Sequence, residues 1–77
     1  MQGGMKMSVK KFITLEGSSF RSWSDAARNA ITDASHTIRG IDRVDVINSW
    51  AKVEEGKIIE YRVKVQISFE VKREVNE

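Results

Sequence analysis

The sequence predicts an α+β fold in which one strand, one helix and two further strands follow each other and form a three-stranded antiparallel sheet. Three features predict this order. The last third of the chain alternates apolar and polar residues, residues 23–38 carry apolar side chains at helical spacing, and Gly56 lies in a short turn between two strand-like segments. A chain of 77 residues has room for one such domain.

The alternation in the last third indicates one unusually long strand. Its apolar positions are Ile59, Tyr61, Val63, Val65, Ile67, Phe69 and Val71. Side chains two apart on a strand share a face, so this pattern predicts one apolar and one polar face. Residues 59–71 would extend about 44 Å at 3.4 Å per residue, whereas a compact domain of this size is about 30 Å across. No glycine or proline eases a bend. We therefore expect the strand to run across a neighbouring subunit.

The first half of the chain predicts a strand over residues 9–15 and then a helix. Val9, Lys11, Ile13 and Leu15 would share one strand face, and Phe12 and Thr14 the other. We expect residues 17–19 (Gly-Ser-Ser) to end this strand. The helix should begin at Ser22, with Asp25 in a position like that of a capping box. Arg39 in the last turn and Gly40 behind it should end the helix. The apolar stripe consists of Trp23, Ala26, Ala27, Ala30, Ile31, Ala34 and Ile38.

Two strands and a short turn complete the domain. Residues 43–53 predict the second strand, residues 54–56 the turn, and residues 57–72 the long strand of an antiparallel hairpin. The pattern leaves open which face of the second strand meets the helix, because a slip of one residue exchanges the faces. We expect residues 1–8 to be a disordered leader or expression remnant, residues 9–73 the single domain, and residues 74–77 a tail.

The composition favours a soluble protein that is stabilised by self-association. Apolar residues make up 40% of the chain and charged residues 31%, which is typical of a folded domain. Small domains usually need disulfides, a structural metal or oligomerisation. The chain contains no cysteine and one histidine, so oligomerisation is the expected reinforcement, in a cytoplasmic setting. No segment is long and apolar enough to span a membrane.

Little in the sequence predicts catalysis or nucleic-acid binding. The single histidine, His36, lies among polar helix positions without a nameable partner, so we expect a surface residue and no enzyme. Acidic and basic residues are interleaved, with a tight basic pair at Lys10 and Lys11, which is unlike the gathered basic face of a nucleic-acid interface. Trp50 has two open readings, stacking on a ligand or packing at an interface. A weak cation site at Asp42 and Asp45, or a cation at the paired Glu54 and Glu55, is the less favoured reading of these carboxylates.

Several segments resemble the dodecin family. They are residues 9–11, the Gly-Ser-Ser turn at 17–19, and the helix opening at 22–27. Residues 41–46 are similar to the dodecin stretch Leu-Asp-Trp-Phe-Glu-Val, and residues 60–63 to its Glu-Tyr-Gln-Val. Phe69 falls where the family has its closing phenylalanine. The spacing between the two latter segments matches without gaps, and the resemblance covers about residues 9–71.

The resemblance implies a sheet partly wrapped around one helix, and twelve subunits in a hollow particle. Flavin-binding dodecins hold riboflavin-type ligands at twofold axes, where a tryptophan stacks on the rings and a glutamine donates hydrogen bonds. By alignment these positions are Arg43 and Arg62 here, and Asp45 lies beside them. Guanidinium groups can stack and donate, but four of them at a twofold axis favour an anion, or Arg–Asp pairing with Asp42 or Asp45, over a neutral flavin. The chain is thus more similar to dodecins that lack the flavin tryptophan.

These observations together predict a homododecamer that binds or stores a small ligand without catalytic turnover. The expected ligands are a flavin such as riboflavin or FMN, another small molecule, or a calcium or magnesium ion at a symmetry axis. The expected binding residues are Arg43, Asp45 and Arg62. One alternative is a purely structural or protein-interaction oligomer. A weaker alternative is an RNA-binding sheet that uses Lys10, Lys11, Arg62 and Lys64.

Overall fold

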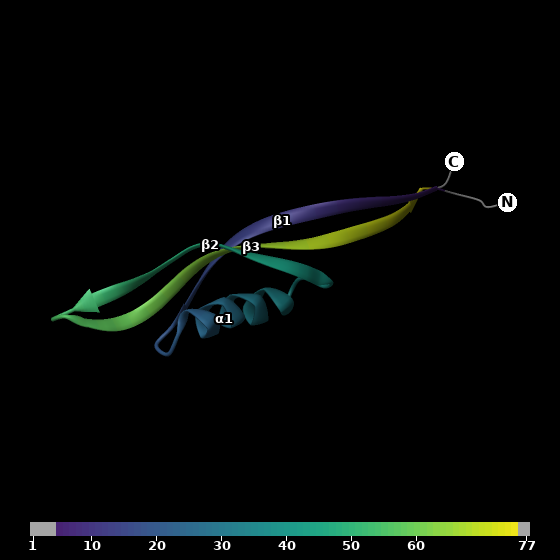
Figure 1. Ribbon diagram of the computed structural model, residues 1–77. Helices are drawn as coiled ribbons and strands as arrows, with labels where there is room; N and C mark the ends of the chain where they lie inside the picture. Colours follow the sequence, from purple (N-terminus) through teal and green to yellow (C-terminus); the bar gives the residue numbers. More distant parts are fainter. Residues whose placement is uncertain (1–4, 76–77) are drawn as a thin grey trace.

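The computed structural model describes the backbone of residues 5–75 and the side chains of residues 8–72. Its elements are β1 (Met5–Ser19), α1 (Trp23–Ser35), β2 (Ile41–Glu54) and β3 (Lys57–Val75), shown in Figure 1. The strands form one sheet in the order β1-β3-β2, and both pairings are antiparallel. The predicted α+β class and the order of its elements are confirmed.

The subunit is far longer than a compact domain of its size. Its principal extents are 68 × 19 × 13 Å and its radius of gyration is 17.6 Å, compared with about 11–12 Å for a compact chain of this length. The long central strand β3, with 19 residues, causes this shape. The helix lies beside the middle of the sheet, and two-stranded ribbons project beyond it at both ends (Figure 1).

The core lies where α1 crosses the sheet. Ala26, Ala30 and Ala34 of the helix are buried against Val63, Val65 and Ile67 of β3. Small alanine side chains allow the helix axis to approach the sheet closely, so the three branched side chains of β3 are almost completely covered. The apolar alternation predicted on β3 is therefore buried in its middle, but Ile59 near the start of the strand stays 37% exposed.

Gly17 corrects the expected end of the first strand. β1 continues through Gly17 and ends at Ser19, so residues 17–19 do not break it. A Cβ at Gly17 would lie 2.2 Å from the main-chain oxygen of Ala26 and 3.0 Å from the Cβ of Ala30. Glycine is thus required at this position because the helix backbone presses on the strand, and not because a turn forms there.

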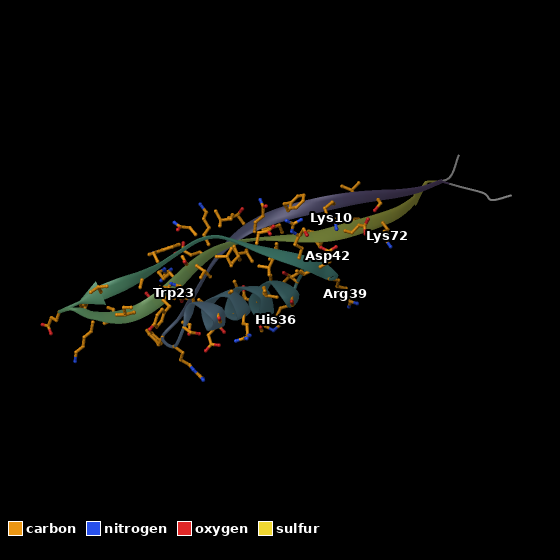
Figure 2. The ribbon with its side chains drawn as sticks, in the orientation of Figure 1. Lys10, Trp23, His36, Arg39, Asp42 and Lys72 are labelled. Atoms are coloured by element: carbon orange, nitrogen blue, oxygen red, sulfur yellow. The ribbon has the colours of Figure 1, made fainter. Side chains whose placement is uncertain are left out.

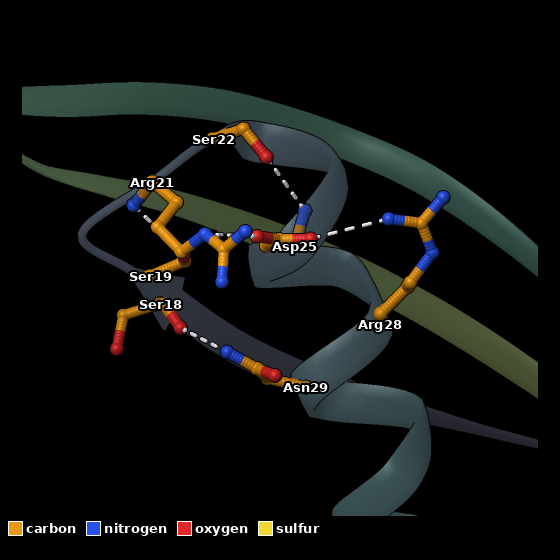
Figure 3. A network of polar contacts seen from close by, with 7 residues as sticks. All are labelled: Ser18, Ser19, Arg21, Ser22, Asp25, Arg28 and Asn29. Atoms are coloured by element: carbon orange, nitrogen blue, oxygen red, sulfur yellow. Dashed lines mark hydrogen bonds and ion pairs between the residues drawn. The ribbon is translucent and has the colours of Figure 1, made fainter.

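The predicted start of α1 is confirmed. The Ser22 hydroxyl accepts a 3.0 Å hydrogen bond from the Asp25 backbone N–H, as an N-cap residue does. The Asp25 carboxylate also pairs with Arg21 and Arg28 (Figure 3). The Asn29 side chain donates to the backbone oxygen of Ser18 at 2.9 Å, which ties the helix to the end of β1. This network holds the β1–α1 connection in place.

The end of α1 lies earlier in the chain than predicted. The helix ends at Ser35 with His36 as its C-cap, so Arg39 is outside the last turn. The N–H groups of Thr37 and Ile38 both donate to the Ala34 carbonyl, which closes the helix there. Ile38 still packs against the core. Gly40, with φ of +76°, instead turns the chain into β2.

The register of the β2–β3 hairpin answers the question that the sequence leaves open. Glu55 and Gly56 both have positive φ and connect the paired residues Glu54 and Lys57, as a two-residue type I′ turn requires. Val44 and Val46 of β2 pair with Ile67 and Val65 and therefore face the helix. A bulge after Val46 shifts the alternation, so that Ser49 and Trp50 lie opposite Val63 and Arg62.

The paired strands extend beyond the domain limits expected at residues 9 and 73. β1 begins at Met5, within the segment expected to be a leader, and residues 5–8 pair with residues 72–75 of β3. Residues 1–4 and 76–77, parts of the expected leader and tail, lie outside the described residues.

Candidate functional site

The candidate site residues lie on the side of the sheet that faces away from α1, which we name the outer face. Its side chains belong to the positions that alternate with the buried Val63, Val65 and Ile67. From β3 it includes Glu60, Arg62, Lys64, Gln66, Ser68 and Glu70; from β1, Lys10, Phe12, Thr14 and Glu16; from β2, Asp42, Arg43, Asp45, Asn48, Trp50 and Lys52. Among the side chains named here, Phe12 and Trp50 are the two aromatic ones, and the others are polar.

Arg43 and Asp45 form an ion pair on β2. They are two residues apart on one strand and so point to the same side. The Arg43 Nε lies 3.1 Å from Asp45 Oδ2 and 3.2 Å from Oδ1. Asp45 is one of the two partners that we expected for this arginine. The Arg43 side chain remains 68% exposed, so its outer donors stay accessible to a ligand.

Arg62 is held by two carboxylates. Its Nε donates to Glu16 Oε2 at 2.8 Å, and its Nη1 donates to Glu60 Oε1 at 3.0 Å. The hydrogen bonds that Arg62 donates, first to Glu16 and then to Glu60, raise the pKa of Arg62 above its usual value. Because Glu16 lies on β1, the guanidinium is drawn towards that strand and away from β2. The local positive charge is neutralised within the subunit.

One subunit does not bring the two arginines together. Arg43 lies opposite Ser68 on β3, which is six residues from Arg62. Six strand residues span about 20 Å. A pocket that contains both Arg43 and Arg62 therefore needs side chains from a second copy.

A third polar cluster joins all three strands and was not predicted as a unit. Lys10 Nζ lies 2.6 Å from Asp42 Oδ2, and the hydroxyl of Ser68 donates to Asp42 Oδ1 at 2.8 Å. Ser68 is only 3% exposed although it lies on the polar face. Figure 2 shows Lys10 and Asp42 directed towards one another from β1 and β2. Asp42 reaches this position because a bulge between Ile41 and Arg43 adds one residue to β2; alternation alone contains no signal for it.

These contacts shift two pKa values in opposite directions. The hydrogen bond from Lys10, followed by that from Ser68, lowers the pKa of Asp42. The hydrogen bond to Asp42 raises the pKa of Lys10. The Asp42 contribution to stability is therefore present above the carboxylate's ordinary value near 4 and is lost as pH falls through its lower folded value. The Lys10 contribution is present below about 10.4 and is lost as pH rises through its higher folded value.

We expect the Asp42→Asn variant to lose less of its folding stability on acidification than the wild type does. The variant lacks a carboxylate whose pKa falls on folding, so its urea midpoint should change less between pH 5 and pH 2 than that of the wild type. Asp33→Asn, at an exposed position of α1, is the matched control and should follow the wild type. Identical pH dependence of wild type and Asp42→Asn would contradict the role given to this ion pair.

The aromatic residues divide between the two faces. Trp23 opens α1, and its indole N–H donates to the main-chain oxygen of Trp50 at 2.8 Å. Its ring meets Tyr61 edge-on with 4.9 Å between centroids. The Trp50 side chain lies on the outer face, opposite Arg62. Both readings of Trp50, stacking on a ligand and packing at an interface, stay open, because its side chain lies on the outer face, where a ligand or a neighbouring copy could reach it.

Other candidate residues are dispersed. His36 is exposed at the end of α1, and Glu54 and Glu55 are exposed at the hairpin turn (Figure 2 labels His36). Within the described residues, no group of three or more histidine, aspartate or glutamate side chains could hold a metal ion. Lys10 and Lys11 point to opposite faces of β1. Among the helices of the described chain, none is long and apolar enough to cross a membrane.

The comparisons with known proteins agree with this architecture. Residues 9–72 match the family model Dodecin. Calcium dodecin from Mycobacterium tuberculosis is 35% identical over 66 residues, which cover 86% of this chain and 93% of the relative. The dodecin structure from Streptomyces coelicolor has a TM-score of 0.80 and 26% identity, covering 83% of this chain and 91% of that one. A mutant dodecin from Thermus thermophilus gives the same score and identity, with coverage of 84% and 97%. The chain therefore belongs to the dodecin family.

Proposed function

We propose that twelve copies of this chain form a hollow shell that binds and stores a small ligand without catalytic turnover. The observation that carries this proposal is the open, elongated subunit, whose central strand extends well beyond the helix that covers it. Membership of the dodecin family supports a ligand-binding oligomer of this kind.

The exposed apolar side chains support assembly. Within the described residues, ten large apolar side chains are 37% exposed or more: Val9, Phe12, Phe20, Trp23, Val44, Val46, Ile47, Val53, Ile58 and Ile59. Three of them, Trp23, Val44 and Val46, line a groove of about 420 Å³ between α1 and β2. Isolated two-stranded ribbons are marginally stable in water, and an exposed apolar groove is typical of an interaction surface. Neighbouring copies of the chain would cover both.

The ion pairs on the outer face bear on the ligand. Four unpaired arginines at a twofold axis would favour an anion over a neutral ligand. Within the subunit, however, Arg43 and Arg62 are each paired with carboxylates. This pairing removes most of the local positive charge. We propose Arg43, Asp45 and Arg62 as the binding residues, and a planar aromatic ligand of the flavin type as their ligand.

A calcium ion is the second candidate ligand. The relative at 35% identity is named Calcium dodecin, and the outer face carries Asp42, Asp45, Glu16 and Glu60. Each of these carboxylates is engaged by Lys or Arg within the subunit. A calcium or magnesium site would therefore have to combine carboxylates of several copies. Calorimetric titration of chelator-treated protein with calcium, and with magnesium as the comparison, tests it.

The mass in solution tests the shell. We expect light scattering to give about 106 kDa, twelve times the 8.8 kDa of the chain. Because association stabilises only the folded form, the thermal midpoint should also rise with protein concentration over a hundredfold range. A folded species with the mass of one chain at micromolar concentration would exclude the shell.

Riboflavin fluorescence tests the ligand. We expect quenching by the assembled protein, and stronger quenching by the double variant Arg43→Trp with Arg62→Gln, which restores an indole surface and an uncharged hydrogen-bond donor. A double variant that keeps the mass of the wild type but gains no quenching would contradict the placement of the binding residues. An assembled wild type that binds neither riboflavin nor calcium would favour the purely structural oligomer.

A further inference from the structure

The outer face contains an aromatic side chain that is not explained by packing within the subunit. Phe12 is 55% exposed on β1, although its neighbours on that face are polar. It lies opposite Ser68 of β3, and Ser68 lies opposite Arg43 of β2. The three residues thus form one row across the sheet, in the order Phe12, Ser68, Arg43.

The small residue in the middle of this row leaves a recess between the two larger ones. Phe12 and Arg43 are two strands apart, which is about 10 Å. The recess has a volume of about 270 Å³ and is lined by Lys10, Phe12, Asp42, Arg43 and Ser68. Its floor is polar but satisfied, because Ser68 and Lys10 both bond to Asp42. Its two walls are a phenyl ring and a guanidinium group.

The walls indicate the chemistry of the occupant. A phenyl ring and a guanidinium both stack on flat aromatic rings. The Nε of Arg43 is bonded to Asp45, and no described residue accepts from its two amino groups, so these can donate to oxygen atoms on the edge of a ligand. A dry cavity of about 150 Å³ is enough for benzene. The recess therefore suits one or two of the fused rings of a planar ligand whose edge carries carbonyl or carboxylate oxygens.

We propose that Phe12 is a binding residue, and that this recess holds the ring of a planar aromatic ligand between Phe12 and Arg43. The inference rests on the proposed function, because Arg43 belongs to the binding residues named there. It goes beyond that function by adding Phe12 of β1 as an aromatic wall. The phenyl ring supplies the aromatic stacking surface that an arginine at position 43 lacks.

Binding of riboflavin and of 2-naphthoate to single variants tests this inference. We expect Phe12→Ala and Phe12→Leu to weaken binding about tenfold or more, because both lack a stacking ring. Phe12→Trp should keep or tighten it. Thr14→Ala, the next residue on the same face of β1, is the control and should bind like the wild type. Because Phe12 is exposed, all variants should fold, and light scattering should show the same mass for each.

Three outcomes would overturn the inference. Equal binding by Phe12→Ala and the wild type would remove Phe12 from the site and leave the proposed function intact. A lower mass for Phe12→Ala would show that Phe12 is a contact between copies and not a ligand wall. An assembled wild type that binds neither probe would remove the aromatic ligand from the proposed function, and this inference with it.

Discussion

Replacing Gly17 by alanine is expected to lower the free energy of unfolding by about 3 kcal/mol or more. The added Cβ would lie 2.2 Å from the main-chain oxygen of Ala26, which cannot rotate away as a side chain could. The helix must therefore shift off the sheet, and the contact of Ala26 and Ala30 with Val63 and Val65 is lost. Urea denaturation measures the loss, and light scattering shows whether assembly survives it.

Gly40→Ala separates steric overlap from backbone strain. Gly40 has φ of +76° and open space around its Cβ position, so this control should cost only about 1 kcal/mol. Ala30→Gly added to Gly17→Ala should not restore stability, because the closer obstacle is the backbone of Ala26. A near-neutral Gly17→Ala, or full rescue by Ala30→Gly, would contradict the close approach of helix and strand.

Truncation of Ile67 to alanine is expected to cost about 2–5 kcal/mol, the range for large-to-small substitutions in a core. Ile67 has no exposed surface and belongs to a buried cluster that, among the described residues, comprises six side chains. Such a small core has few neighbours that can relax into the cavity, so the upper part of that range is expected. The thermal and urea midpoints of the variant measure the effect.

A graded series gives the internal comparison. Ile67→Val removes one methyl group and should cost about 0.5–1.5 kcal/mol. A larger loss of unfolding free energy for Ile67→Ala than for Ile67→Val then shows that the loss grows with the size of the cavity. If Ile67→Ala cost no more than Ile67→Val, the centre of the sheet would not be the core of this protein.

The regular elements could be predicted from the sequence because their signals are local. The alternation of residues 59–71 and the spacing of the alanines in α1 each follow from the period of one element. The Ser22 cap was predicted correctly for the same reason, since its hydrogen bond spans three residues. The predicted end of α1 lies too far along the chain. The hydrogen bonds from Thr37 and Ile38 to the Ala34 carbonyl end the helix earlier, and they do not change the spacing of the apolar residues.

The candidate site was predictable only in part. Alternation placed Arg62 on the polar face of β3, and the family resemblance directed attention to Arg43 and Asp45. Their ion pairs, and the cluster of Lys10, Asp42 and Ser68, depend on which strands are neighbours and on bulges in β2. The residues of that cluster come from three strands, and contacts between strands are not encoded by the period of any one of them.

The amino-acid sequence by itself determined the elements, their order and the excess length of the last strand, because these depend on local periodicity and on chain length. Tertiary structure alone decided that Gly17 is a contact with the helix, that β2 turns Val44 towards α1, and that Phe12, Ser68 and Arg43 share one row. The physical reason is register. A bulge or a shift of one residue leaves the pattern of apolar residues unchanged, yet it exchanges which side chains meet.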